Sequence, residues 1–187
     1  MSLTKSTAVA AIVAAAPSLP TVFATGFTPR IAASTAHQGN GSHFFMTGSM
    51  GLALSIGTGL AWETRRTTLV VDGDGSLLMN PSGLVAVGAA PGLPLVHLVL
   101  DDGRYDSTGG QLTPGRTTAL IAWARASGIR HTTPSPRRTS CPHICRASSR
   151  TAALPSSYAA SCPRTPSLRH CGSPRTWPTS QGGFVVR

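Results

Sequence analysis

The stretch VVDGDGSLLMN, residues 70–80, places Gly73-Asp74-Gly75 directly after a run of β-branched residues. Such a run predicts a buried strand, and a carboxylate between two glycines at its end allows two interpretations. The first is a tight turn at the edge of a sheet. The second is a binding site, in which Asp74 holds a metal ion and the glycines let a phosphate approach the backbone.

Apolar segments on either side of this stretch alternate between helical and strand-like patterns. Helical spacing predicts helices over residues 4–16, 51–63, 82–90 and 117–128, the third with Asn80 as its N-cap and Pro81 in its first turn. Continuous apolar runs predict strands over residues 21–25, 67–72 and 93–102, and HFFMTGSMG (43–51) is a short apolar run that ends in a glycine turn. The alternation predicts an α/β fold, a parallel sheet with helices on both faces.

The composition of the chain changes near residue 130. Residues 1–130 hold eight Lys or Arg against all six acids, a net charge of about +2, whereas residues 131–187 hold eight Arg and no acid, a net charge of +8. The second segment also contains all four cysteines and eight of the fifteen prolines, and it has no sustained periodicity. We therefore expect a truncated domain at 1–130, its sheet incomplete at the C-terminal edge, and a disordered basic Pro/Ser/Thr/Arg-rich tail at 131–187.

The tail allows several interpretations, of which a disulfide framework of its four cysteines is disfavoured in a cytoplasmic protein. Reading a GC-rich gene one base late turns Ala, Leu, Val and acidic codons into Pro, Ser, Thr and Arg codons, so the tail has the composition of a frameshifted last third of the domain. Its arginines could instead bind nucleic acid, although they are scattered and few aromatic side chains lie between them to stack on bases. A zinc site is a further interpretation, with a loose C-x3-C spacing in Pro-rich surroundings; its ligands would come from Cys141, His143, Cys145, His170 and Cys171. We favour the frameshift.

The N-terminal stretch MSLTKSTAVAAIVAAAPSLP has the charge and small apolar residues of a weak secretory signal. We favour an Ala-rich amphipathic helix that ends before Pro17, because TVFATGF reads as a strand and turn that start at once. No segment approaches the roughly 18–20 apolar residues of a transmembrane helix. We expect a cytoplasmic protein without a membrane partner.

Acidic turns follow two of the predicted strands, at Asp74 and at Asp101-Asp102. In parallel sheets, ligands bind beyond the carboxyl ends of the strands. Asp74 and Asp102 lie 28 positions apart, one strand–helix–strand crossover, which can place the two strand ends side by side. Mg²⁺ takes one or two carboxylates together with phosphate oxygens and water, and the glycines expose backbone N–H groups for a diphosphate. The second acidic turn therefore favours a binding site.

Three stretches also occur in the order found in a known family. GDGS (73–76), followed about 26 residues later by a second polar strand end, resembles the thiamine-diphosphate motif. HFFMTGSMGLALSIGTGLA (43–61) and LDDGRYDSTGGQLT (100–113) resemble the diphosphate-binding domain of phosphonopyruvate decarboxylase and of the sulfopyruvate decarboxylase β subunit. The resemblance covers residues 1 to about 130. It implies the thiamine-diphosphate-binding fold, with thiamine diphosphate and Mg²⁺ as cofactors.

The resemblance also implies residue roles. Asp74, the side chain of Asp102 and the backbone carbonyl of Arg104 would ligate Mg²⁺. Gly75 and Ser76 would contact the diphosphate, Gly48 and Met50 would offer backbone contacts to the aminopyrimidine, and the Met50 side chain would support the bent cofactor. YDSTGGQ (105–111) would form a loop over the diphosphate. The cofactor-binding residues expected in this way are Gly48, Ser49, Met50, Gly73, Asp74, Gly75, Ser76, Asp102, Arg104, Tyr105, Ser107 and Thr108.

The function implied by the resemblance is decarboxylation of a 2-oxo acid of the phosphonopyruvate or sulfopyruvate type to an aldehyde, with the cofactor taking up the electrons. The family's pyrimidine-binding domain, which carries an activating glutamate, is missing; Glu63, the one glutamate here, has no motif around it. The catalytic residues are therefore expected on a separate α-type subunit or homologous chain. The alternatives are an inactive truncated remnant and a nucleic-acid-binding protein that uses its basic tail.

Three further residues carry expectations. Asp102 stands where the family usually has Asn, so its extra negative charge is expected to weaken cofactor binding. His43 is expected either to face the substrate or to have a structural role. His97 lies within a predicted buried strand, and we expect a packed core residue rather than a catalyst.

Overall fold

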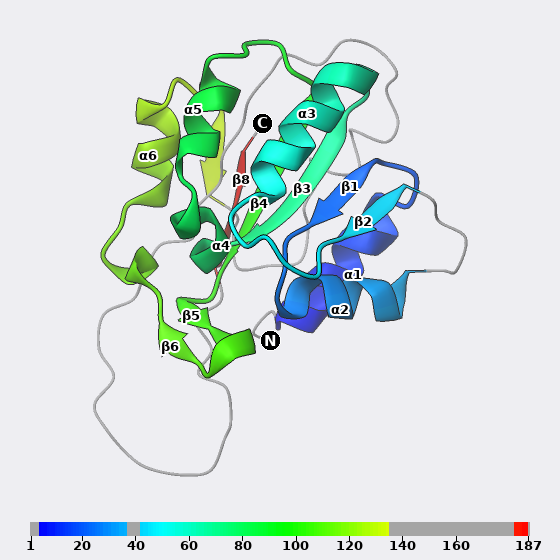
Figure 1. The fold of residues 1–187 in the computed structure, drawn as a ribbon, viewed down its shortest axis with the longest axis vertical. Helices are drawn as coiled ribbons and strands as arrows, with labels where there is room; N and C mark the ends of the chain where they lie inside the picture. Colours follow the sequence, from blue (N-terminus) through cyan, green and yellow to red (C-terminus); the bar gives the residue numbers. More distant parts are fainter. Residues whose placement is uncertain (1–3, 37–41, 135–181, 187) are drawn as a thin grey trace.

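A computed structural model describes residues 4–36, 42–134 and 182–186. Within them, six strands form one sheet in the order β2-β1-β3-β4-β8-β7, and a two-stranded hairpin, β5-β6, lies beside it (Figure 1). The strands are β1 (Thr21–Phe23), β2 (His43–Phe45), β3 (Thr68–Gly73), β4 (Leu95–Asp101), β5 (Arg104–Tyr105), β6 (Gln111–Leu112), β7 (Thr132–Pro134) and β8 (Gly182–Val186). The helices are α1 (Lys5–Ala15), α2 (Phe27–Thr35), α3 (Ala53–Thr64), α4 (Asp74–Met79), α5 (Ser82–Gly88) and α6 (Leu120–Ala126), with 3₁₀ turns η1 (Asp106–Thr108) and η2 (Pro114–Arg116).

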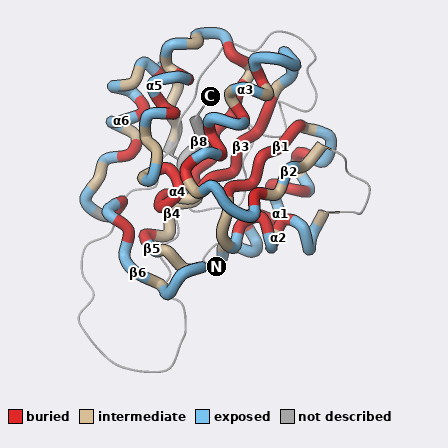
Figure 2. Tube along the Cα trace, in the orientation of Figure 1, coloured by how far each residue is buried: buried red, intermediate tan, exposed pale blue. Residues whose placement is uncertain are grey.

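The central strands are parallel and carry the core. β2, β1, β3 and β4 pair in parallel, with β3 and β4 in register from Thr68↔Leu95 to Gly73↔Leu100. Both strands are buried along nearly their whole length, as Figure 2 shows. Such runs are apolar on both faces because helices cover the sheet from both sides. The predicted α/β fold with a parallel sheet and helices on both faces is confirmed.

Helix α3 lies on one face of the sheet, and helices α1 and α2 lie on the other. A Cβ added to Gly57 of α3 would lie 2.1 Å from Cγ2 of Val70, so α3 rests directly on one face of β3. Val22 pairs with Val70, and the next residue, Phe23, points to the opposite face. On that face the Phe23 ring packs edge-on against His43, whose Nε2 lies 3.5 Å from the carbonyl oxygen that follows α1. Helices α1 and α2 therefore cover the face that α3 leaves open.

The predicted helices and strands are found with shifted ends, and several other elements were missed. Helix α2 follows Gly26, whose φ of 115° is a conformation that glycine adopts readily; its short, weakly apolar sequence, with Pro29 in the first turn, was not predicted as a helix. The hairpin β5-β6 lies within the expected YDSTGGQ loop and its flanks. Helix α4 begins at Asp74 itself, so Gly73-Asp74-Gly75 is a strand-to-helix junction and not a tight turn.

The predicted N-cap role of Asn80 is wrong. Pro81, not Asn80, occupies the N-cap position of helix α5, and no side chain caps the helix with a hydrogen bond. The Asn80 Oδ1 atom instead accepts a hydrogen bond from the Ser82 hydroxyl at 2.5 Å. This bond withdraws the side chain from the helix N–H groups, so the Asn-Pro pair marks the start of the helix without capping it.

Two stretches of the expected disordered tail are strands. β8 pairs antiparallel with β4, and β7 pairs antiparallel with β8, so the sheet continues past β4. The expectation of no regular structure after residue 130 is therefore wrong for Thr132–Pro134 and Gly182–Val186. The Cys/His set of the tail, Cys141 to Cys171, lies outside the described residues, as do all eight of its arginines.

The N-terminal segment is part of the domain. The predicted helix is α1, and its Val9, Ile12 and Val13 side chains are buried in the core. Among the described residues, no helix combines the length and apolar character needed to cross a bilayer.

The contact between α3 and β3 gives a prediction with a matched control. Gly57→Ala should destabilise the protein by about 1–3 kcal/mol, because the new methyl group overlaps Val70 in a packed core. Gly59→Ala lies in the same helix with open space around its added Cβ, and should stabilise by up to about 1 kcal/mol through helix propensity. Urea unfolding followed by circular dichroism measures both. Equal changes in the two variants would contradict this packing.

Candidate functional site

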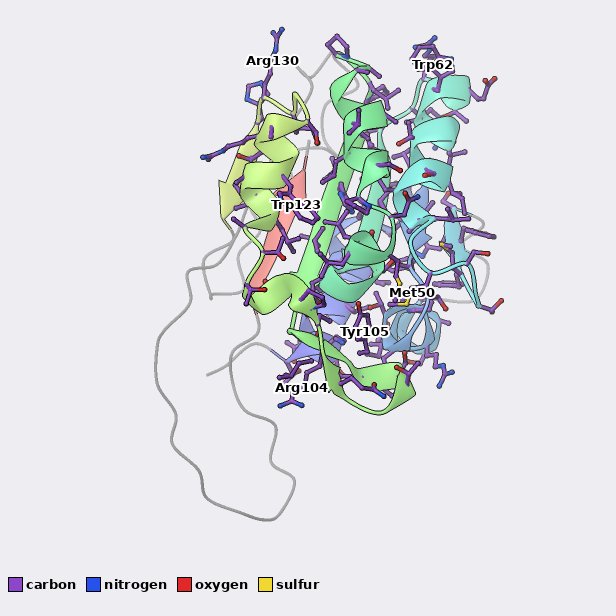
Figure 3. The ribbon with its side chains drawn as sticks, turned by 60° about the vertical axis from the view of Figure 1, so that its left-hand side comes forward. Met50, Trp62, Arg104, Tyr105, Trp123 and Arg130 are labelled. Carbon is purple, nitrogen blue, oxygen red and sulfur yellow. The ribbon has the colours of Figure 1, made fainter. Side chains whose placement is uncertain are left out.

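The two acidic strand ends lie side by side. β3 and β4 are adjacent and parallel, so Asp74, directly after β3, and Asp102, directly after β4, emerge at the same edge of the sheet. The sequence predicted this juxtaposition from the spacing of the two residues. Figure 3 shows Met50, Tyr105 and Arg104 at this end of the molecule, with Trp62 and Arg130 at the opposite end.

Asp74 is a buried carboxylate whose surroundings favour its neutral form. Its residue is 1% exposed, and Oδ2 accepts a hydrogen bond of 2.5 Å from the Thr113 hydroxyl. Burial, together with the charges of Asp101 and Asp102, raises the pKa of Asp74 from 3.8 to about 7, although the bond from Thr113 acts in the other direction. A cation at this position would remove that penalty, so the site is suited to a positive ligand.

Asp102 and Asp106 share a cation that sequence reasoning missed. The Lys5 ammonium, from the first turn of α1, forms an ion pair with Oδ2 of Asp102 and lies 3.3 Å from Oδ2 of Asp106. Burial lowers the pKa of Lys5, but the two carboxylates outweigh it and the pKa lies above its ordinary value. Nothing in the sequence signals this contact, because 97 positions separate Lys5 from Asp102.

A cleft of about 420 Å³, including the space open to solvent, runs along this edge. Nine of the twelve expected cofactor-binding residues line it: Met50, Gly73, Asp74, Gly75, Ser76, Asp102, Arg104, Tyr105 and Ser107. Gly48, Ser49 and Thr108 do not. The lining residues that were not expected are Lys5, Thr25, Gly26, Phe27, Thr28, Leu100 and Asp106. Residues 25–28 follow β1, so the rule that ligands bind at strand ends could have found them.

The GSMG turn at 48–51 is fastened to helix α4. Ser49 has a left-handed φ of 56°, and Gly51 has a φ of 93°. The Gly51 N–H donates to the Ser76 hydroxyl oxygen at 3.2 Å, and a Cβ on Gly51 would come within 3.0 Å of Asn80. Ser76 therefore holds the turn that presents Met50 to the cleft, a role that the sequence did not predict.

Strand β5 and the following turn, residues 104–107 of the hairpin, line one side of the cleft. The Arg104 N–H donates to Asp102 Oδ1 at 3.2 Å, and its guanidinium Nη1 donates to the Gly110 carbonyl at 2.9 Å. The Tyr105 ring lies so close to the main chain that a Cβ on Gly75 would come within 2.4 Å of it. The hairpin thus packs onto the start of α4, and glycine at position 75 leaves the necessary space.

His43 and His97, the two histidines considered from the sequence, both pack against other side chains. The His43 ring lies edge-on to Phe23 and Phe45, with centroid distances of 5.6 Å and 6.1 Å. His97 is fully buried, and its Nε2 lies 3.2 Å from Oδ2 of Asp72, whose Oδ1 accepts the Gly73 N–H at 2.9 Å. This pair fixes the main chain immediately before Asp74.

Comparison with known proteins gives the family. The model of the thiamine pyrophosphate enzyme C-terminal TPP binding domain matches residues 24–136. The chain belongs to this family. Thiamine pyrophosphate is another name for thiamine diphosphate, so the resemblance stated from the three motifs is confirmed.

Curated relatives of this TPP binding domain include two kinds of decarboxylase. Phosphonopyruvate decarboxylase of Streptomyces viridochromogenes is 55% identical over 89 residues, which is 47% of this chain and 22% of that protein. Sulfopyruvate decarboxylase subunit beta of Methanothermobacter thermautotrophicus is 46% identical over 87 residues, 46% of this chain and 47% of the subunit. The aligned region thus spans less than half of each relative.

A solved structure shares the fold. A chain from Mycobacterium smegmatis, assigned to the thiamin diphosphate-dependent enzymes, superposes with a TM-score of 0.55 at 24% identity. The superposition covers 70% of this chain and 26% of that one. It supports the α/β architecture of the TPP binding domain.

The raised pKa of Asp74 predicts how the stability of the metal-free protein changes with pH. Between about pH 4 and pH 7 the folded protein retains a proton at Asp74 that the unfolded chain has released, so the free energy of unfolding falls as the pH rises. Above pH 7 Asp74 adds no further slope. Asp74→Asn keeps an acceptor for Thr113 but cannot titrate, so its stability should fall less over this window. Urea unfolding across this pH range measures the free energy of unfolding of the wild type and of the variant. Equal pH dependence in the two proteins would contradict a raised pKa at Asp74.

Proposed function

We propose that this chain binds thiamine diphosphate with Mg²⁺ and forms the cofactor-binding part of a 2-oxo acid decarboxylase of the phosphonopyruvate or sulfopyruvate type. The observation that carries the proposal is the pairing of two acidic strand ends in a cleft of the TPP binding domain. The relatives that bear these substrate names support the substrate class.

The residues present fit the proposed ligands. Asp74 and Asp102 offer hard oxygen donors, and Mg²⁺ needs only one or two carboxylates when phosphate and water complete its shell. Among the described residues, no group of three or more His, Cys, Asp or Glu is arranged to hold a metal, so the proposed site relies on the diphosphate and on the Arg104 carbonyl. The space beside Gly73 is open where a side chain would stand, which leaves its backbone accessible to a phosphate.

Each element of the cleft has a part in the proposed activity. Thiamine diphosphate, when bound, supplies the electron sink that a 2-oxo acid needs to lose carbon dioxide. Asp74 and Asp102 would hold the metal, the hairpin with Tyr105 and Ser107 would exclude water from the diphosphate, and Met50 would support the thiamine. Glu63, the one glutamate, is exposed in the last turn of α3, next to Trp62 at the opposite end of the molecule (Figure 3).

The proposed activity needs a second protein chain. The site offers no glutamate to activate the aminopyrimidine, so we propose that a pyrimidine-binding α-type subunit or homologous chain provides it. Three relatives named sulfopyruvate decarboxylase subunit beta support a divided enzyme, since a beta subunit implies a second subunit. Activity of this chain would then require its partner.

Isothermal titration with thiamine diphosphate tests the proposal. The wild type should bind saturably in the presence of Mg²⁺ and not in EDTA, and Asp74→Asn should weaken binding by about tenfold or more because the metal loses a charged ligand. Asp102→Asn should tighten binding, because it removes a negative charge near the diphosphate and keeps an oxygen ligand. Glu63→Gln removes the same charge far from the cleft and should bind as the wild type does. Metal-independent binding, or none, would overturn the proposal.

A second candidate is that the chain is an inactive remnant of such an enzyme. The family match ends at residue 136, close to the change in composition near residue 130, and this supports a frameshifted tail. The nucleotide sequence of codons 125–190, translated in the other frames, tests the frameshift. A frame that continues with acids, a buried strand and an amphipathic helix is the expected result, and no protein-like frame would contradict the frameshift.

A further inference from the structure

Lys5 is the one lysine of the chain, and it sits at the acidic end of the cleft. Its side chain is 19% exposed, and that of its ion-pair partner Asp102 is 9% exposed. The second partner, Asp106, belongs to η1 in the hairpin loop. The contact therefore ties the start of α1 to the two segments that follow β4.

The ammonium of Lys5 neutralises a carboxylate that the proposed metal also needs. A mostly buried Asp102 is costly without a positive partner, and Lys5 provides one in the metal-free protein. A dication bound to Asp102 would lie within a few ångströms of the ammonium, where like charges repel strongly in protein surroundings. Lys5 and Mg²⁺ would therefore compete for Asp102.

A diphosphate changes this competition. Its oxygens accept charge-assisted hydrogen bonds from an ammonium, so in its presence Lys5 has a second set of partners within the cleft. Arg104, the other basic residue of the lining, already donates its Nη1 to the Gly110 carbonyl. Lys5 is thus the cation of the cleft that is placed to exchange partners.

We propose that Lys5 is the internal counter-ion of the cofactor site. When Mg²⁺ and the diphosphate bind together, the Lys5 ammonium leaves Asp102 and binds a phosphate oxygen instead. The inference rests on the proposed function and adds a ligand-binding residue to it. Its consequence is cooperativity: Lys5 opposes Mg²⁺ alone and favours Mg²⁺ with diphosphate, so each ligand increases the affinity of the other.

Two titrations of the variant Lys5→Met test the exchange. Compared with the wild type, the variant should bind Mg²⁺ alone about tenfold tighter or more, because a like charge is removed beside the metal. It should bind thiamine diphosphate at saturating Mg²⁺ about tenfold more weakly, because a phosphate contact is lost. Arg66→Met is the matched control: it removes the same charge before β3, at the opposite end of the sheet, and should change neither affinity.

A labelling experiment on the wild-type chain gives an answer even if Lys5→Met does not fold. Acetylation of the single lysine, followed by mass spectrometry of its peptide, should be slow in the metal-free protein, faster with Mg²⁺ alone, and slow again with Mg²⁺ and thiamine diphosphate. A rate that Mg²⁺ alone leaves unchanged would overturn the exchange.

The two proposals fail in different ways. If the wild type binds thiamine diphosphate with Mg²⁺, and Lys5→Met changes both affinities in the same direction or neither, only the role of Lys5 is overturned. If neither protein binds thiamine diphosphate, the proposed function and the role of Lys5 are overturned together.

Discussion

The parallel pairing of β3 with β4 is the constraint on which the site depends. Six residue pairs fix their register, and the segments that leave the two strands must therefore begin at the same edge of the sheet. One of these segments starts with Asp74, and the other carries Asp102 and the hairpin. A shift of one residue in either strand would turn its side chains to the other face and separate the carboxylates. The α3 helix, with Gly57 against Val70, keeps this pair of strands covered.

The electrostatics of the cleft are arranged for a cation. Asp74 is buried with a pKa of about 7, and Asp102 relies on an ammonium from a distant helix. Behind them, the buried pair of His97 and Asp72 holds the Gly73 N–H and so the start of α4. Clustered carboxylates lower the stability of a domain when no cation is present. Such a loss of stability is typical of residues that bind a ligand.

Much of the fold and part of the site could be predicted because both follow from local patterns. The alternation of apolar runs gave the parallel sheet, and the two acidic strand ends gave Asp74 and Asp102 as neighbours. Helix α2 was missed because it is short and only weakly apolar on average and has Pro29 in its first turn, and packing against α1 supports it. Lys5 could not be predicted either, since its contact depends on where α1 docks. Strands β7 and β8 were missed because the composition of the tail as a whole indicates disorder, although Phe184-Val185-Val186 is a short apolar run of the kind that can form a strand.

We propose that the carboxylates at the ends of β3 and β4 hold a metal beside a diphosphate. A crystal structure of the protein grown with Mn²⁺ and thiamine diphosphate, with anomalous data at the manganese edge, tests it most directly. We expect one strong anomalous peak between Asp74 and Asp102, at about 2.1 Å from a carboxylate oxygen of each, with the diphosphate beside it. A cofactor bound elsewhere, or a metal that neither carboxylate touches, would contradict the proposed site.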